Sequence, residues 1–166
     1  SSGPGTPQHL AAVLLEQLSG VQLVHVPYKG VAPSITDLLA NHVSIGFAGL
    51  PAGLPHVQKG SLKPLAVSSK ASSPAAPQVP PVAATPGLEQ FELNQWFGIW
   101  VPKGTPAPVV AQIQRDMAAV LQMPEVKDTL EKQGAQPSGM PTAEFAKFVQ
   151  EERKKFAAIV RAANLK

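Results

Sequence analysis

The strongest constraint on the fold is an alternation of helical and strand-like patterns over the first 68 residues. In the helical patterns apolar residues recur at intervals of three and four, and the segments between them are short, apolar and partly β-branched. The sequence predicts helices over 7–19, 33–40 and 51–59, and strands over 21–26, 42–47 and 62–68. Such an alternation predicts an α/β fold in which helices cover a parallel sheet and ligands bind at the carboxyl ends of the strands.

The pattern changes after Ser68. From Ser72 to Gly87 the chain is rich in proline, alanine and serine, which predicts a loop and a crossover between domains. Beyond it the sequence predicts one strand over 94–101 and three helices, over 109–121, 124–133 and 141–164. A lone strand has no partner to complete its ladder, so we expect its sheet to come mostly from sequence outside these 166 residues. The alternative is a small helical subdomain that is complete in itself.

Composition excludes several classes of function. The chain has no cysteine, which rules out disulfides, thiol catalysis and thiolate metal sites. Its four histidines are not paired with one another or with carboxylates at metal-ligand spacings, so neither a metal nor a cofactor is expected. A net charge of +3 is too small to indicate a nucleic-acid partner. No apolar run approaches the roughly 20 residues of a membrane span, so direct membrane insertion is not expected.

The opening segment is the strongest candidate binding site. It combines hydroxyls and glycines directly before a helix, in the residues Ser1, Ser2, Gly3, Gly5 and Thr6. Free N–H groups and the helix dipole favour an anion at a helix start, and glycines let the backbone approach it closely. The pattern matches neither the phosphate-binding G-x-x-x-x-G-K-[ST] loop nor the G-x-S-x-G of a nucleophilic serine. The alternative interpretation is a plain capped helix start behind a turn.

Three further positions are candidates for the same site. Tyr28 and Gly30 follow a predicted strand, where pocket residues usually lie, and Lys29 between them would attract anions. The alternative is a surface turn with a half-buried tyrosine. His9 lies in the first turn of the helix that follows the loop, where it would either contact a ligand or brace the loop. Trp96 fits the core better than a ligand platform, and Trp100 does too.

Several stretches, taken together, resemble the Bug (TctC-like) solute-binding receptors of tripartite tricarboxylate transporters. They follow the order of the family over all 166 residues. The matching residues are Ser1-Ser2-Gly3-x-Gly5-Thr6-x-x-His9-Leu10, His25-Val26-Pro27-Tyr28-Lys29-Gly30, Asp37-Leu38-Leu39, Leu65-Ala66-Val67, Val79-Pro80, Trp96-Phe97-Gly98, Gly104-Thr105-Pro106 and Glu144-Phe145. The first two motifs are specific in combination, whereas each alone would be weak.

The resemblance implies a type II periplasmic-binding-protein fold, in which two α/β lobes close over a small carboxylate. Residues 1–87 would be most of the second lobe, and residues 88–166 would be the part of the chain that returns into the first lobe. The first lobe's own ligand-binding loop would lie upstream of this sequence. The implied protein is periplasmic, is not an enzyme, and delivers a small organic acid to membrane transporter components.

Two positions depart from the family pattern, and one of them, Met140 in place of the usual Ser/Thr cap before the last helix, should weaken that helix start and leave function alone. Where many members have Asp or Asn after the second strand, this sequence has Ala48, between Phe47 and Gly49. The alanine side chain cannot form a hydrogen bond, so a ligand group contacted at this position in relatives loses a partner. We therefore count Ala48 among the ligand-binding positions that the resemblance implies, together with the loop, His9, Tyr28 and Gly30.

Two other functions stay open at this level. A serine-dependent hydrolase or transferase would use Ser1 or Ser2 with His9, and it needs a hydrogen-bonded base and an orienting acid. No Asp or Glu occupies an obvious position for that acid. The other possibility is a stable fragment without a complete ligand site, since half a cleft can order an anion but cannot enclose it.

Overall fold

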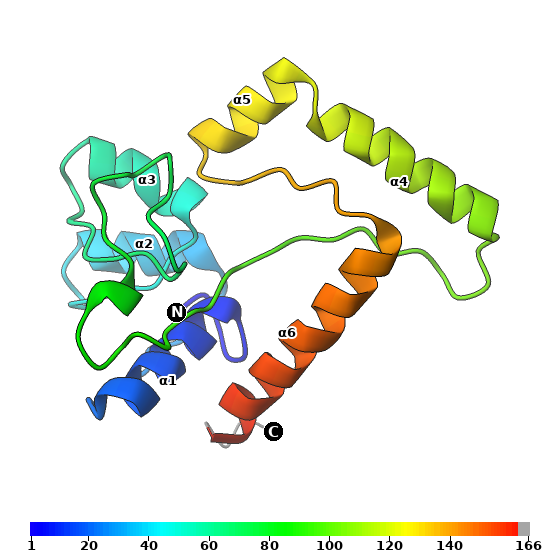
Figure 1. Cartoon of the computed structure of the whole chain (residues 1–166). Helices are drawn as coiled ribbons and strands as arrows, with labels where there is room; N and C mark the ends of the chain where they lie inside the picture. Colours follow the sequence, from blue (N-terminus) through cyan, green and yellow to red (C-terminus); the bar gives the residue numbers. More distant parts are fainter. Residues whose placement is uncertain (163–166) are drawn as a thin grey trace.

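The computed structural model describes residues 1–162 of the chain and is built from helices joined by open segments (Figure 1). The helices are α1 (Pro7–Ser19), α2 (Val31–Leu39), α3 (Leu50–Gln58), the short 3₁₀ helix η1 (Val82–Ala84), α4 (Ala107–Leu121), α5 (Pro124–Lys132) and α6 (Thr142–Ala162). All six α-helices were predicted from sequence, with ends that differ by a few residues. The predicted end of the last helix, residues 163–164, lies outside the described residues.

Local sequence sets the limits of α1. Thr6 is its N-cap, with extended backbone and a side-chain oxygen that accepts from the His9 N–H. Pro7 occupies the first helical position, where no N–H is needed. At the other end Gly20 has φ +73°, and its N–H donates to the Glu16 carbonyl. These two caps place the Ser1–Thr6 loop directly at the amino end of the helix.

The predicted strands do not form a regular sheet within residues 1–162, and this corrects the sequence prediction. The part of the chain that the structure describes holds one parallel bridge, between Val67 and Pro81. The Val67 N–H donates to Pro80 O (2.9 Å), and the Val82 N–H donates to Val67 O (2.9 Å). A strand exists only where a second extended segment pairs with it. Apart from the bonds of Ser1 to Val26 and Tyr28, residues 21–26, 42–47 and 94–101 form no such ladder among the described residues, so they run as open segments.

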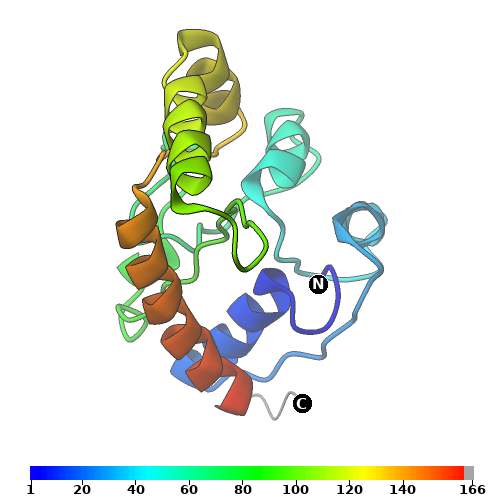
Figure 2. The same cartoon turned by 90° about the vertical axis from the view of Figure 1, so that its right-hand side faces the viewer.

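The main core joins the beginning and the end of the chain. It is formed where α1 and α6 pack together with residues 88–93. Its buried residues are Leu10, Ala11, Val13, Leu88, Phe91, Leu93 and Ile159. This core crosses residue 87, so the two parts of the chain that the sequence separated share their apolar packing. Figure 2 shows α6 lying beside α1, whereas α4 and α5 extend away from both.

A second, smaller core lies under the proline-rich segment. Leu54 of α3 packs against Ala76 and Val79, which are only 1% and 3% exposed. The segment from Ser72 to Gly87 is therefore a compact loop with one 3₁₀ turn and not a free linker. No helix among residues 1–162 has the length and apolar character needed to cross a membrane.

The two tryptophans have different environments. Trp96 is half-buried, packs edge-on against Phe145 and Phe148 of α6, and donates its indole N–H to Glu152 Oε2 (3.2 Å). Trp100 touches Phe145 but is 66% exposed. The expectation of a core residue is confirmed in part for Trp96 and is wrong for Trp100, because the sheet that would cover Trp100 is not formed within residues 1–162.

Candidate functional site

The Ser1–Thr6 loop is fixed along the segment that follows α1. The Ser1 N-terminal amine donates to Val26 O (3.0 Å), and the Tyr28 N–H donates to Ser1 O (3.0 Å). These two bonds around one residue follow the pattern of a parallel ladder. A third bond runs from the Gly30 N–H to Ser2 O (3.1 Å). The structure therefore brings the loop together with Tyr28 and Gly30, as the sequence predicted.

The loop turns tightly at its two glycines. Gly3 has φ +135° and Gly5 has φ +71°, both in the region that disfavours other residues. A side chain on Gly3 would also place its Cβ 3.3 Å from the Tyr28 carbonyl oxygen. Thr6 closes the turn, since its hydroxyl donates to Gly3 O at 2.7 Å. The glycines are thus needed for the backbone path and for the contact with residue 28.

His9 supports the loop through a hydrogen bond to its backbone. It is 7% exposed, and its Nδ1 accepts the Gly5 N–H at 3.1 Å. The sequence left open whether His9 contacts a ligand or supports the loop, and this hydrogen bond shows support. Burial lowers the pKa of His9, and the Ser1 ammonium lowers it further, while Glu16 acts in the opposite direction.

His25 is a site residue that the sequence analysis did not select. Its ring stacks on His9, with centroids 3.8 Å apart and planes 8° from parallel. Its Nε2 lies 2.6 Å from the Ser1 hydroxyl. Burial lowers the pKa of His25 as well, with a smaller contribution from His9. The sequence signal was weak, because His9 and His25 are 16 positions apart and belong to a helix and an open segment.

Two glutamines connect the loop to the open segment 94–101. The Ser2 hydroxyl donates to Gln8 Oε1 (2.9 Å), and Gln8 Nε2 donates to Gln95 Oε1 (3.0 Å). A Cβ on Gly49, the N-cap of α3, would lie 3.5 Å from the same Gln95 oxygen. Ala48 directly precedes Gly49 and is exposed. The starts of α1 and α3 therefore flank Gln95, a contact across 87 positions that no local pattern indicates.

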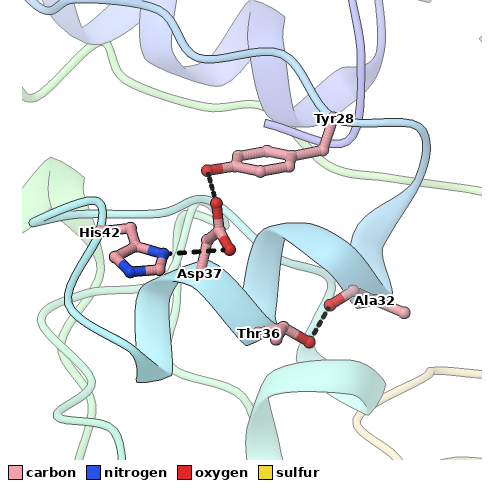
Figure 3. A network of polar contacts seen from close by, with 5 residues as sticks. All are labelled: Tyr28, Ala32, Thr36, Asp37 and His42. Carbon is pink, nitrogen blue, oxygen red and sulfur yellow. Dashed lines mark hydrogen bonds and ion pairs between the residues drawn. The ribbon is translucent and has the colours of Figure 1, made fainter.

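The Tyr28 hydroxyl is already engaged. Figure 3 shows it donating to Asp37 Oδ2 on α2 at 2.7 Å, while His42 Nδ1 lies 3.4 Å from Asp37 Oδ1. The hydrogen bond from Tyr28 lowers the pKa of Asp37, and it raises the pKa of Tyr28 itself. The Tyr28 hydroxyl therefore already has a partner, and this hydrogen bond links α2 to the segment before it.

The arrangement suits an anion better than covalent chemistry. The N–H groups of Ser2 and Gln8 have no acceptor among residues 1–162, and both lie where the α1 dipole is positive. The serine–histidine pairing expected for a hydrolase is not formed with His9, because Ser1 pairs with His25 and Ser2 with Gln8. Within the described residues no carboxylate hydrogen-bonds His25, and no three potential ligand side chains gather for a metal ion.

The comparison with protein families matches almost the whole chain. The model of the tripartite tricarboxylate transporter family receptor (TctC) matches residues 1–165. A Pseudomonas knackmussii protein, described as the UPF0065 protein in the clcB-clcD intergenic region, is 37% identical over 138 residues, which are 83% of this chain and 82% of that protein. BugT of Bordetella pertussis is 31% identical over 157 residues, which are 95% of this chain and 48% of BugT. The chain spans about half the length of most curated relatives that it matches.

Solved structures give the same assignment. A Rhodopseudomonas palustris protein solved with adipate has a TM-score of 0.89 and 30% identity, and the match covers 99% of this chain and 55% of that one. A periplasmic transporter structure has a TM-score of 0.86 and 34% identity over 100% of this chain and 55% of that one. MatC of Rhodopseudomonas palustris, with bound malate, has a TM-score of 0.77 and 25% identity over 92% of this chain and 53% of that one.

These matches confirm the fold class predicted from sequence, an α/β type II periplasmic-binding-protein fold of which this chain is part. About 45% of each of these two solved relatives has no counterpart in this chain. The chain belongs to the tripartite tricarboxylate transporter receptor (TctC/Bug) family of solute-binding proteins.

Proposed function

We propose that this chain is the ligand-binding half of an extracytoplasmic receptor that captures a small organic carboxylate for a tripartite tricarboxylate transporter. The observation that carries the proposal is the Ser1–Thr6 loop, with two free N–H groups at the amino end of α1 and no competing protein acceptor among residues 1–162. Family membership supports it, because two of the matching solved structures contain adipate and malate.

In this proposal one carboxylate of the ligand binds at the loop. The N–H groups of Ser2 and Gln8 donate to its oxygens, while the Ser1 and Ser2 hydroxyls hold the loop through their contacts with His25 and Gln8. Gly5 and Gly30 have no side chains to occupy the space for the carboxylate, and the charge of Lys29 raises the local concentration of anions. Ala48 adds no polar contact, which favours a ligand whose remaining surface near α3 is apolar.

The opposite wall of the site is proposed to come from the part of the receptor that this chain does not span. Residues 1–87 then form most of one lobe, and residues 88–166 return into the other. Exposed apolar side chains support this division, because Phe97 is 87% exposed and Val24 is 94% exposed along segments that lack a neighbouring strand. Periplasmic location and delivery to a membrane transporter complete the proposal.

Calorimetric titration of the full-length protein with mono-, di- and tricarboxylates tests the receptor directly. The matched variants are Gly5→Ala and Gly20→Ala, at opposite ends of α1. Both glycines have almost the same φ (+71° and +73°) and open space around the missing Cβ, so both substitutions carry a similar backbone strain. We expect Gly5→Ala to weaken carboxylate binding about ten-fold or more, equivalent to at least ~1.4 kcal/mol, and Gly20→Ala to leave it unchanged. Equal effects of the two variants, or no binding of any acid, would contradict the proposal.

The 2.6 Å contact between Ser1 and His25 makes ester hydrolysis the second candidate function. It is the weaker one, because no carboxylate among residues 1–162 orients the His25 ring and Nε2 instead helps to hold the loop. Turnover of small esters that disappears in Ser1→Ala would favour the hydrolase over the receptor.

A further inference from the structure

Two stacked histidines hold the two ends of the binding loop. His25 Nε2 contacts the Ser1 hydroxyl at 2.6 Å, and His9 Nδ1 accepts the Gly5 N–H at 3.1 Å. Their rings lie 3.8 Å apart and nearly parallel. The pair therefore connects the first residue of the loop to the residue just before the N-cap.

This arrangement exists only for an unprotonated His9 Nδ1. A ring nitrogen that accepts a backbone N–H cannot carry a proton, so protonation at Nδ1 replaces the bond with a contact between two donors. A second positive charge on the stacked ring would be repelled at this distance. Of the charged groups in the packed elements, the Glu16 carboxylate acts on the pair and raises the pKa of both rings, against the larger effect of burial.

We propose that His9 and His25 are positioning residues that keep the loop in its anion-binding shape only while both imidazoles are neutral, so that carboxylate binding weakens on acidification. The proposal rests on the receptor function and extends it to regulation of the same loop. Burial lowers the pKa of both rings, so both imidazoles are neutral near pH 7. We expect the supported shape of the loop to be lost only at more acidic pH.

The substitution His9→Asn tests the support of the loop separately from the protonation of the ring. The Asn side-chain oxygen can occupy the place of Nδ1 and accept the Gly5 N–H, but it does not titrate. We expect wild-type affinity for a dicarboxylate to fall as the pH drops from 8 through the histidine titration, by up to about ten-fold below both pKa values if the free and bound pKa differ by one unit. His9→Asn should bind normally at pH 8 and lose this dependence, whereas His9→Ala should bind weakly at both pH values. His56→Asn, on α3 and away from the loop, should keep the wild-type profile.

A second measurement does not depend on the ligand. Nitrogen-15 NMR reports the protonation of His9 and His25, and hydrogen exchange reports protection of the Gly5 amide. We expect Gly5 protection to be lost as His9 protonates, and to persist in His9→Asn at acidic pH. Protection that stays constant through the histidine titration overturns the positioning role, as does an affinity that rises on acidification in wild type but not in His9→Asn. If Gly5 protection follows His9 protonation but no carboxylate binds at any pH, the positioning role of the two histidines is supported and the receptor function is refuted.

Discussion

At the scale of single residues, the site depends on contacts between side chains that are distant in sequence. Ser1 meets His25, and Gln8 meets Gln95, each through one hydrogen bond. Loop residues such as Gly3 and Thr6 were recognisable because their role is local, set by backbone angles and capping. His25 and the glutamines had no such local signal, so only the folded chain identifies them.

Phe91 offers a direct test of the core at this scale. It is 0% exposed, and we expect Phe91→Ala to lower the free energy of unfolding by about 3–5 kcal/mol, the usual cost of removing a buried aromatic ring. Urea denaturation monitored by circular dichroism measures this. Both variants are measured in the 166-residue chain, where the control Phe97→Ala, six residues further on and 87% exposed, should change the free energy by less than about 0.5 kcal/mol. Similar losses for the two variants would mean that Phe91 is not in the core of the protein.

At the scale of elements, α1 connects the site to the core. Its amino end presents the loop and its capping threonine, while its buried face packs through Leu10, Ala11 and Val13 against α6 and residues 88–93. The loop therefore cannot change its shape freely without disturbing a helix that the core holds in place. For this reason the short run of serines and glycines before α1 can form a rigid binding loop.

Removing the cap should loosen this connection. The Thr6 hydroxyl donates to Gly3 O at 2.7 Å and accepts from the His9 N–H at 3.4 Å, so Thr6→Ala loses both bonds. We expect a loss of about 1 kcal/mol in unfolding free energy, measured by thermal or urea denaturation, and we expect Thr6→Ser to retain most of it. Thr36→Ala serves as control, because the exposed Thr36 hydroxyl only bonds a carbonyl within α2, and no loss is expected there.

At the scale of the whole molecule, the chain leaves apolar side chains uncovered along its open segments. Val24 and Phe97 are 94% and 87% exposed, and Leu65 and Trp100 exceed 60%. We propose that the rest of the receptor packs against these side chains, because they lie along segments that lack a neighbouring strand. The length of the solved relatives, of which this chain covers about 55%, is consistent with that interpretation.

We expect the 166-residue chain alone to bind the dye ANS, which reports exposed apolar surface. The double variant Val24→Thr, Phe97→Thr should reduce this fluorescence by about half or more, because it removes the two most exposed apolar side chains of the open segments. Val109→Thr on α4, a scattered exposed residue, should have little effect. Unchanged fluorescence in the double variant would show that these segments are covered in solution, for example by self-association.

The sequence determined the helices, their caps, the glycine-dependent loop and the family, because these depend on local periodicity, backbone preference and motif order. It also predicted segments able to form strands, at 21–26 and 94–101 among others. Tertiary structure decided whether these segments pair, since a strand requires a hydrogen-bonded neighbour that local sequence cannot supply. It likewise decided that His9 braces the loop and that His25 stacks on it, because the contact of two rings 16 positions apart follows from the path of the chain and not from any spacing along it.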